Sequence, residues 1–135
     1  MRHYYKKYIF LLFILIFSEY LIAQHKKNID ISGTWSYEVR NTPSGDYTGS
    51  IDLRKVNYKY EGEIVESNGM KYPLTVIEYK GDKLVFTSTV ENTNSTFTCT
   101  FFGDSIKADI DVQGDDFQYK LKGKKVTPDK KKNAL

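Results

Sequence analysis

Few residues in this chain have side chains suited to catalysis, and they are scattered. His25 is the one histidine beyond residue 23, and Cys99 is the one cysteine. A nucleophilic serine or cysteine needs a positioned base, and a zinc site needs several histidine or cysteine ligands. Cys99 alternates with Phe97 and Phe101, which indicates a small buried hydrophobe. We therefore predict no catalytic residues, no metal site and no cofactor.

Two pairs of carboxylates are the remaining candidates for acid–base chemistry. Asp109 and Asp111 stand two residues apart, as do Glu61 and Glu63, so each pair shares one face of a strand. A general acid needs a raised pKa, which requires burial or a close partner. Both pairs alternate with apolar residues and are expected to face solvent. An enzyme that uses Asp, Glu and Tyr is therefore the least favoured function class.

Aromatic side chains are the more informative feature. The chain has 11 Tyr and 8 Phe. Such rings could line a cavity for a lipid or another apolar molecule, with tyrosine hydroxyls orienting it. The alternative, favoured by the shortness of the strands, is that they fill a closed interior completely. The candidate ligand-binding residues, all expected inside a barrel, are Trp35, Tyr37, Tyr47, Tyr60, Phe86, Phe97, Phe101, Phe117 and Tyr119.

Short segments of alternating apolar and polar residues, separated by turn signals, must position these rings. Val, Ile, Thr, Tyr and Phe are frequent, and no apolar stripe recurs at helical spacing. Asn68-Gly69 is the strongest hairpin signal, because both positions of a type I′ turn need positive φ. We expect eight strands, over about residues 33–40, 47–56, 60–64, 71–79, 84–90, 95–102, 106–113 and 117–121.

Eight consecutive strands with short connections form an antiparallel meander, because parallel pairing needs long crossovers. Closing the meander buries the apolar stripe and removes both sheet edges. The predicted fold is all-β, an eight-stranded up-and-down (lipocalin-like) barrel, with a β-sandwich as the alternative. One register stays open. A two-residue turn at Gly81-Asp82 would turn Ile77 and Tyr79 inward, whereas a three-residue turn would turn Leu74 and Val76 inward.

The first 23 residues are not expected to belong to the barrel. Basic residues precede the apolar run from Ile9 to Phe17, and small and polar residues then lead to Ala23. This order is typical of a secretory signal peptide cut after Ala23. A retained membrane anchor is the alternative, but the run is much shorter than the ~20 residues of a membrane-spanning helix. We predict a periplasmic or secreted protein without stable membrane insertion after cleavage.

The predicted organisation is a signal peptide (1–23), a polar lead-in (24–32), the barrel (33–123) and a lysine-rich flexible tail (124–135). The net charge is +3 for the whole chain, but −5 between Ile29 and Gly123, because lysines gather at the ends. A mildly acidic domain gives no reason to propose a nucleic-acid partner.

The residues Gly33-Thr34-Trp35 resemble the Gly-x-Trp opening of lipocalin-like (calycin-type) barrels. The resemblance extends over residues 49–53, 60–64, 81–86 and 102–106. It implies a small bacterial lipocalin-like domain in which Trp35 plugs one end of the barrel. Lipocalins usually pack an arginine near the final strand on this tryptophan, and the corresponding place here offers Lys120, Lys122 and Lys124.

These features together predict a non-enzymatic exported domain that binds a small apolar ligand or an envelope protein. The alternative is a structural or inhibitory envelope module that binds a protein partner through its surface. Phe102, Val85 and Val65, expected on the outer face, would then contribute to the contact.

Overall fold

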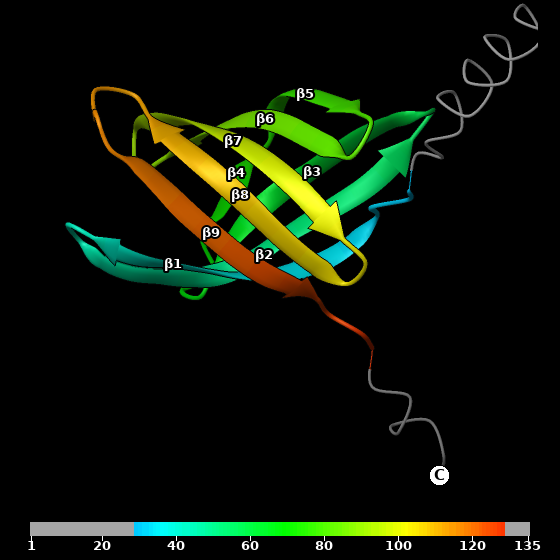
Figure 1. Cartoon of the computed structure of the whole chain (residues 1–135), viewed down its shortest axis with the longest axis horizontal. Helices are drawn as coiled ribbons and strands as arrows, with labels where there is room; N and C mark the ends of the chain where they lie inside the picture. Colours follow the sequence, from blue (N-terminus) through cyan, green and yellow to red (C-terminus); the bar gives the residue numbers. More distant parts are fainter. Residues whose placement is uncertain (1–28, 129–135) are drawn as a thin grey trace, which may run out of the picture.

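The computed structural model describes residues 29–128, which form an antiparallel all-β fold (Figure 1). The predicted signal peptide and the end of the lysine-rich tail lie outside this range. The part that is described contains no helix long and apolar enough to cross a membrane. The strands are β1 (Gly33–Thr42), β2 (Gly45–Val56), β3 (Lys59–Glu66), β4 (Lys71–Pro73), β5 (Thr75–Lys80), β6 (Lys83–Val90), β7 (Thr93–Phe102), β8 (Ser105–Val112) and β9 (Gln118–Lys125).

All the strands belong to one sheet that curls into a nearly closed barrel. Their order is β4-β3-β2-β1-β9-β8-β7-β6-β5, so the first strand pairs with the last. The two edge strands, β4 and β5, follow each other in the chain. β4 pairs with β3, whereas β5 pairs with β6. Between them, the Leu74 N–H donates to the Gly62 oxygen at 3.0 Å. The predicted fourth strand is therefore one bent segment that joins the two edges of the sheet. It forms two strands, β4 and β5, so the barrel has nine strands instead of the predicted eight.

The bent segment satisfies the first of the two predicted registers. Tyr79 lies opposite Leu84, so the turn at Gly81-Asp82 has two residues, and Ile77 and Tyr79 pack against the core. The register shifts between Thr75 and Glu78, as in a β-bulge. Because the bulge adds a residue, Leu74 is buried as well, while Val76 has a φ of +48° and is 80% exposed.

The alternation read from the sequence produces a single core inside the barrel. Phe86 and Phe97 are direct partners across β6 and β7, and their rings stack at 4.8 Å. Phe86 is fully buried, as is Cys99 on the same inner face. The other buried apolar residues from the strands include Trp35, Val39, Ile51, Leu53, Tyr60, Ile64, Leu84, Phe101, Ile106, Ala108, Ile110, Tyr119 and Leu121.

The lead-in and Trp35 close one end of the barrel. The Trp35 indole N–H donates to the Ile31 oxygen at 2.9 Å, and Ile31 itself is 1% exposed. Phe101 meets the Trp35 ring edge-on at 4.8 Å, and Tyr60 meets Tyr79 edge-on at 5.3 Å. Trp35 thus plugs this end as the resemblance implies, and the end of the predicted lead-in is part of the folded domain.

A lysine near the end of β9 lies over Trp35. Lys125 Nζ lies 5.5 Å from the centre of the Trp35 ring, and the two residues are partners in the β1–β9 ladder. The inner face of β9 carries the odd-numbered residues, so Lys120, Lys122 and Lys124, which stand where lipocalins usually have an arginine, are exposed on the outer face. The barrel also extends to Lys125 rather than ending at Gly123.

Candidate ligand-binding cavity

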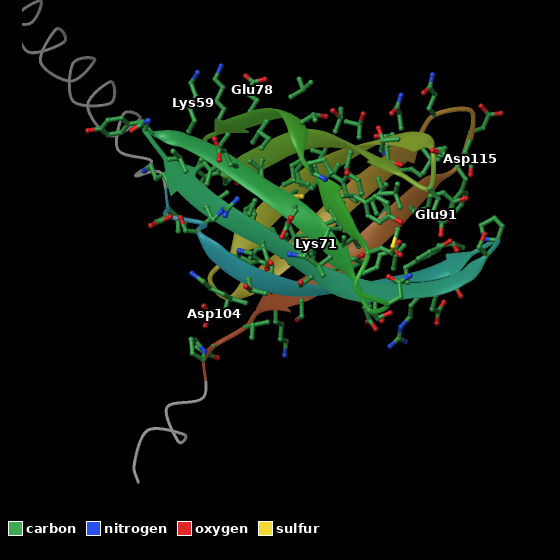
Figure 2. All side chains as sticks on the ribbon, turned by 180° about the vertical axis from the view of Figure 1, so that it is seen from behind. Lys59, Lys71, Glu78, Glu91, Asp104 and Asp115 are labelled. Atoms are coloured by element: carbon green, nitrogen blue, oxygen red, sulfur yellow. The ribbon has the colours of Figure 1, made fainter. Side chains whose placement is uncertain are left out.

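The end of the barrel opposite Trp35 opens into a cavity of about 330 Å³. Residues of the β1–β2, β6–β7 and β8–β9 connections contribute to its lining. Figure 1 shows these three connections at the same end of the barrel. Figure 2 shows Glu91 and Asp115, from two of these connections, at one end of the barrel, and Lys59 and Asp104 at the other. The volume falls within the range of ~300–1,000 Å³ that is usual for small-molecule sites.

Aliphatic and aromatic side chains from strands all around the barrel form the floor of the cavity. Phe97 lies among them, and Phe86, stacked on its ring, belongs to the filled half below. The barrel interior is therefore hollow in its open half and packed in its closed half. The apolar residues of the floor and walls are Val39, Ile51, Ile64, Val90, Phe97, Ile110, Val112 and Leu121.

Polar groups gather nearer the mouth. The Tyr119 hydroxyl donates to Asp115 Oδ2 at 2.5 Å. This hydrogen bond raises the pKa of Tyr119 and lowers the pKa of Asp115. Asp115 also accepts the Phe117 N–H at 3.0 Å, which fixes the β8–β9 connection at the rim. The other polar lining residues are Tyr37, Thr42, Ser44, Tyr47, Glu66, Glu91, Thr93 and Ser95.

A tyrosine and a glutamate face each other across a glycine on the inner wall. Tyr37 on β1 is the partner of Gly49 on β2, and Gly49 is in turn the partner of Glu66 on β3. A Cβ at Gly49 would lie 3.0 Å from the Tyr37 hydroxyl oxygen and 3.1 Å from the Glu66 Cα. The missing side chain therefore leaves room for the phenol to lie over β2 toward the glutamate.

Glu66 is buried and Tyr37 is partly buried. Burial, together with the negative charge of Glu66, raises the pKa of Tyr37 to about 12. Glu66 is 8% exposed, and its Oε2 accepts a hydrogen bond from Asn68 Nδ2 at 3.1 Å. Burial likewise raises the pKa of Tyr72, which pairs with β3 beside this wall.

The predicted binding residues divide into three groups. Tyr37, Tyr47, Phe97 and Tyr119 line the cavity. Trp35, Tyr60, Phe86 and Phe101 are inside the barrel but fill its closed half. The interior placement of Phe117 was wrong. It precedes β9, is 62% exposed and touches Tyr119 from outside at 5.1 Å, because the strand alternation begins only at Gln118.

Sequence reasoning missed the acidic lining residues and most of the aliphatic wall. Glu66 was within reach of the same argument, since it continues the inward series Tyr60, Gly62 and Ile64. The predicted third strand ended at Ile64, so it did not include Glu66. Glu91 and Asp115 lie in turns, where alternation carries no information about direction.

The other groups considered for chemistry have structural roles. One carboxylate of each outward pair forms an ion pair, Glu63 with Lys71 at 2.8 Å and Asp109 with Lys120 at 2.5 Å, and Asp111 accepts a hydrogen bond from Gln118. Burial raises the pKa of the Cys99 thiol to about 12. Between residues 29 and 128, no three His, Cys, Asp or Glu side chains cluster closely enough to hold a metal ion.

No protein-family model matches this chain, and no curated protein matches it significantly. Among solved structures it is similar to a de novo designed fluorescence-activating β-barrel, with a TM-score of 0.51 over 71% of this chain and 94% of that one. The fold is an antiparallel β-barrel. The two sequences are only 15% identical, so the similarity concerns the barrel fold and not the residues inside it.

Proposed function

We propose that this chain is an exported, non-enzymatic, lipocalin-like binding protein that takes a small apolar ligand into the open half of its barrel. The observation that carries the proposal is the cavity of about 330 Å³. An apolar floor with a few convergent polar groups is typical of small-molecule sites. The packed closed half supports the proposal, because a rigid base preorganises the walls above it.

Export rests on the sequence of the first 23 residues. The basic start, the apolar run from Ile9 to Phe17 and the small residue Ala23 together support a cleaved signal peptide and a periplasmic or secreted location.

Binding of the neutral dye Nile red to the purified protein tests the proposal. We expect a blue-shifted, enhanced emission that saturates at one dye per chain. Replacing Val112, which lines the cavity, with Phe should weaken dye binding several-fold by occupying part of the volume. The control is Asp111→Phe, which places the same ring at the neighbouring exposed position. Absence of dye binding, or equal binding by both variants, would contradict a ligand site inside the barrel.

The alternative proposal is a structural or inhibitory envelope module that binds a protein partner through its outer surface. Phe102 is 57% exposed, with Lys107 Nζ 5.9 Å from its ring centre. Val65 and Val85 are half-buried on other strands. This alternative gains support if the barrel takes up no apolar molecule.

A further inference from the structure

The cavity that we propose as the ligand site is acidic. Its lining includes the carboxylates Glu66, Glu91 and Asp115. Among the described residues, no lysine or arginine contributes to that lining. Every ion pair between described residues instead uses a carboxylate other than these three.

Glu66 is the carboxylate that stands out, because it belongs to the inner face of a strand, whereas Glu91 and Asp115 lie in connections between strands. It is 92% buried and lies on the inner face of β3, next to Ile64 and opposite Gly49. The one side-chain hydrogen bond found for it comes from the neutral amide of Asn68. An ionised carboxylate in such a place loses hydration without gaining a counter-charge. A cation brought by a ligand would supply that charge.

The surroundings of Glu66 suit the rest of such a ligand. Tyr37 approaches from β1 over Gly49, and its hydroxyl and ring border the same space. Tyr47 and Tyr119 also line the cavity. Aromatic faces attract ammonium groups, most strongly where water is excluded. Below them the floor is apolar, so one molecule would meet negative charge at one end and hydrocarbon at the other.

We infer that the ligand is an amphipathic cation, an alkyl- or arylammonium compound whose charged group lies against Glu66 and Tyr37 and whose apolar part occupies the cavity floor. This inference rests on the proposed function. Glu91 and Asp115 at the mouth attract cations toward the opening. An apolar anion such as a fatty acid would place a second negative charge beside Glu66 and is rejected.

Three ligands with the same alkyl chain separate charge from hydrophobicity. Calorimetric titration of the purified protein with octyltrimethylammonium, 1-octanol and octanoate should rank their affinities in that order, with about a tenfold preference for the cation over the alcohol. Added salt should reduce this preference, because the cation is held by charge.

A variant assigns the preference to its residue. Glu66→Gln keeps the side-chain volume and an oxygen that can accept the hydrogen bond from Asn68, and it should lower the ratio of cation to alcohol affinity several-fold. The control is Glu61→Gln on the outer face of the same strand, which should keep the wild-type ratio.

The outcomes separate the two proposals. If 1-octanol binds as tightly as the cation, or octanoate binds best, the cation inference is overturned while the ligand site stands. If no compound binds, the ligand site fails and the cation inference with it. The wild-type series is decisive by itself should Glu66→Gln not fold.

Discussion

Trp35 is the single residue on which the closed end depends. It is 2% exposed, donates to the Ile31 oxygen and packs edge-on against Phe101. Trp35→Ala should lower the free energy of unfolding by about 3–5 kcal/mol, because it leaves a large cavity and an unpaired carbonyl. Urea unfolding measures this, with Trp35→Phe expected to be intermediate. A near-neutral Trp35→Ala would mean that Trp35 is not the plug.

The Tyr37 phenol should make the protein less stable at alkaline pH. Its pKa is raised from 10.0 to about 12 in the folded state, mainly by burial. The unfolded chain therefore loses this proton first, and the stabilisation present below pH 10 is lost as pH rises toward 12. Tyr37→Phe should remove about 1–2 kcal/mol of that pH dependence, allowing for partial exposure.

The matched control for that experiment is Tyr58→Phe, since Tyr58 lies in the β2–β3 turn and is 95% exposed. Unfolding curves at pH 8, 10 and 11.5 give the comparison. Identical pH profiles for wild type and Tyr37→Phe would contradict the burial of this hydroxyl.

Cys99 should react only when the barrel opens. Its side chain is fully buried on the inner face of β7, and burial raises its pKa to about 12. Thiol reagents attack the thiolate, which is scarce at pH 8 for such a group. We expect labelling, followed by mass, to proceed at the rate of unfolding and to accelerate in denaturant. Rapid labelling of the native protein would show that β7 is accessible.

The observed positions of individual side chains show where prediction from the alternating pattern succeeds. Alternation correctly placed Tyr37, Phe97 and Cys99 inside, because side chains in a strand have a strict period of two. It failed at Phe117, because the period of two does not apply before the strand begins. It also failed at Lys125, because the strand continues beyond its last apolar residue. Alternation predicts which face a residue occupies within a strand, but it does not predict where the strand begins or ends.

At the scale of elements, the bent segment β4–β5 carries an identifiable strain. Val76 has a φ of +48°, a region in which a β-branched residue is destabilised. Its side chain is 80% exposed, so little burial is lost by removing it. Val76→Gly should therefore raise the free energy of unfolding by about 0.5–1 kcal/mol.

Val56→Gly is the control, since Val56 is also exposed but has no positive φ. Glycine should destabilise the protein there, because it only adds disorder to the unfolded chain. Thermal unfolding of both variants decides the sign. If Val76→Gly is also destabilising, the bulge does not strain the chain at this residue.

The β4–β5 segment also shows how much of a single element could be predicted from the sequence. The sequence left two registers open at Gly81-Asp82, and the structure has the one with a two-residue turn, which turns Ile77 and Tyr79 inward. The bulge was not predictable from alternation, because an extra residue is defined only against the partner strand. The bulge lets one segment leave β3, bend at Leu74 and join β6. The predicted meander of eight strands therefore closes as a barrel of nine.

At the scale of the whole molecule, the barrel is asymmetric along its axis. The closed half is filled by Trp35, Phe101, Phe86 and the lead-in, while the open half is bounded by turns and acidic side chains. The two sequence-based alternatives, a filled interior and a ligand cavity, are therefore each correct for one half. Alternation fixes which face a residue occupies but not its height along the barrel, so the sequence could not assign the halves.

The proposed export is the part of the proposed function that most needs measurement, because it decides which compartment supplies the ligand. We expect the mature protein to begin at Gln24, since Ala23 ends the small and polar stretch after the apolar run. Intact mass of the protein recovered from the envelope fraction measures this directly. Ala23→Arg should block cleavage and leave the longer chain in the membrane fraction, whereas Lys26→Arg, beyond the cleavage site, should be processed normally. A soluble protein that retains Met1 to Ala23 would contradict export and direct the search for a ligand to the cytoplasm.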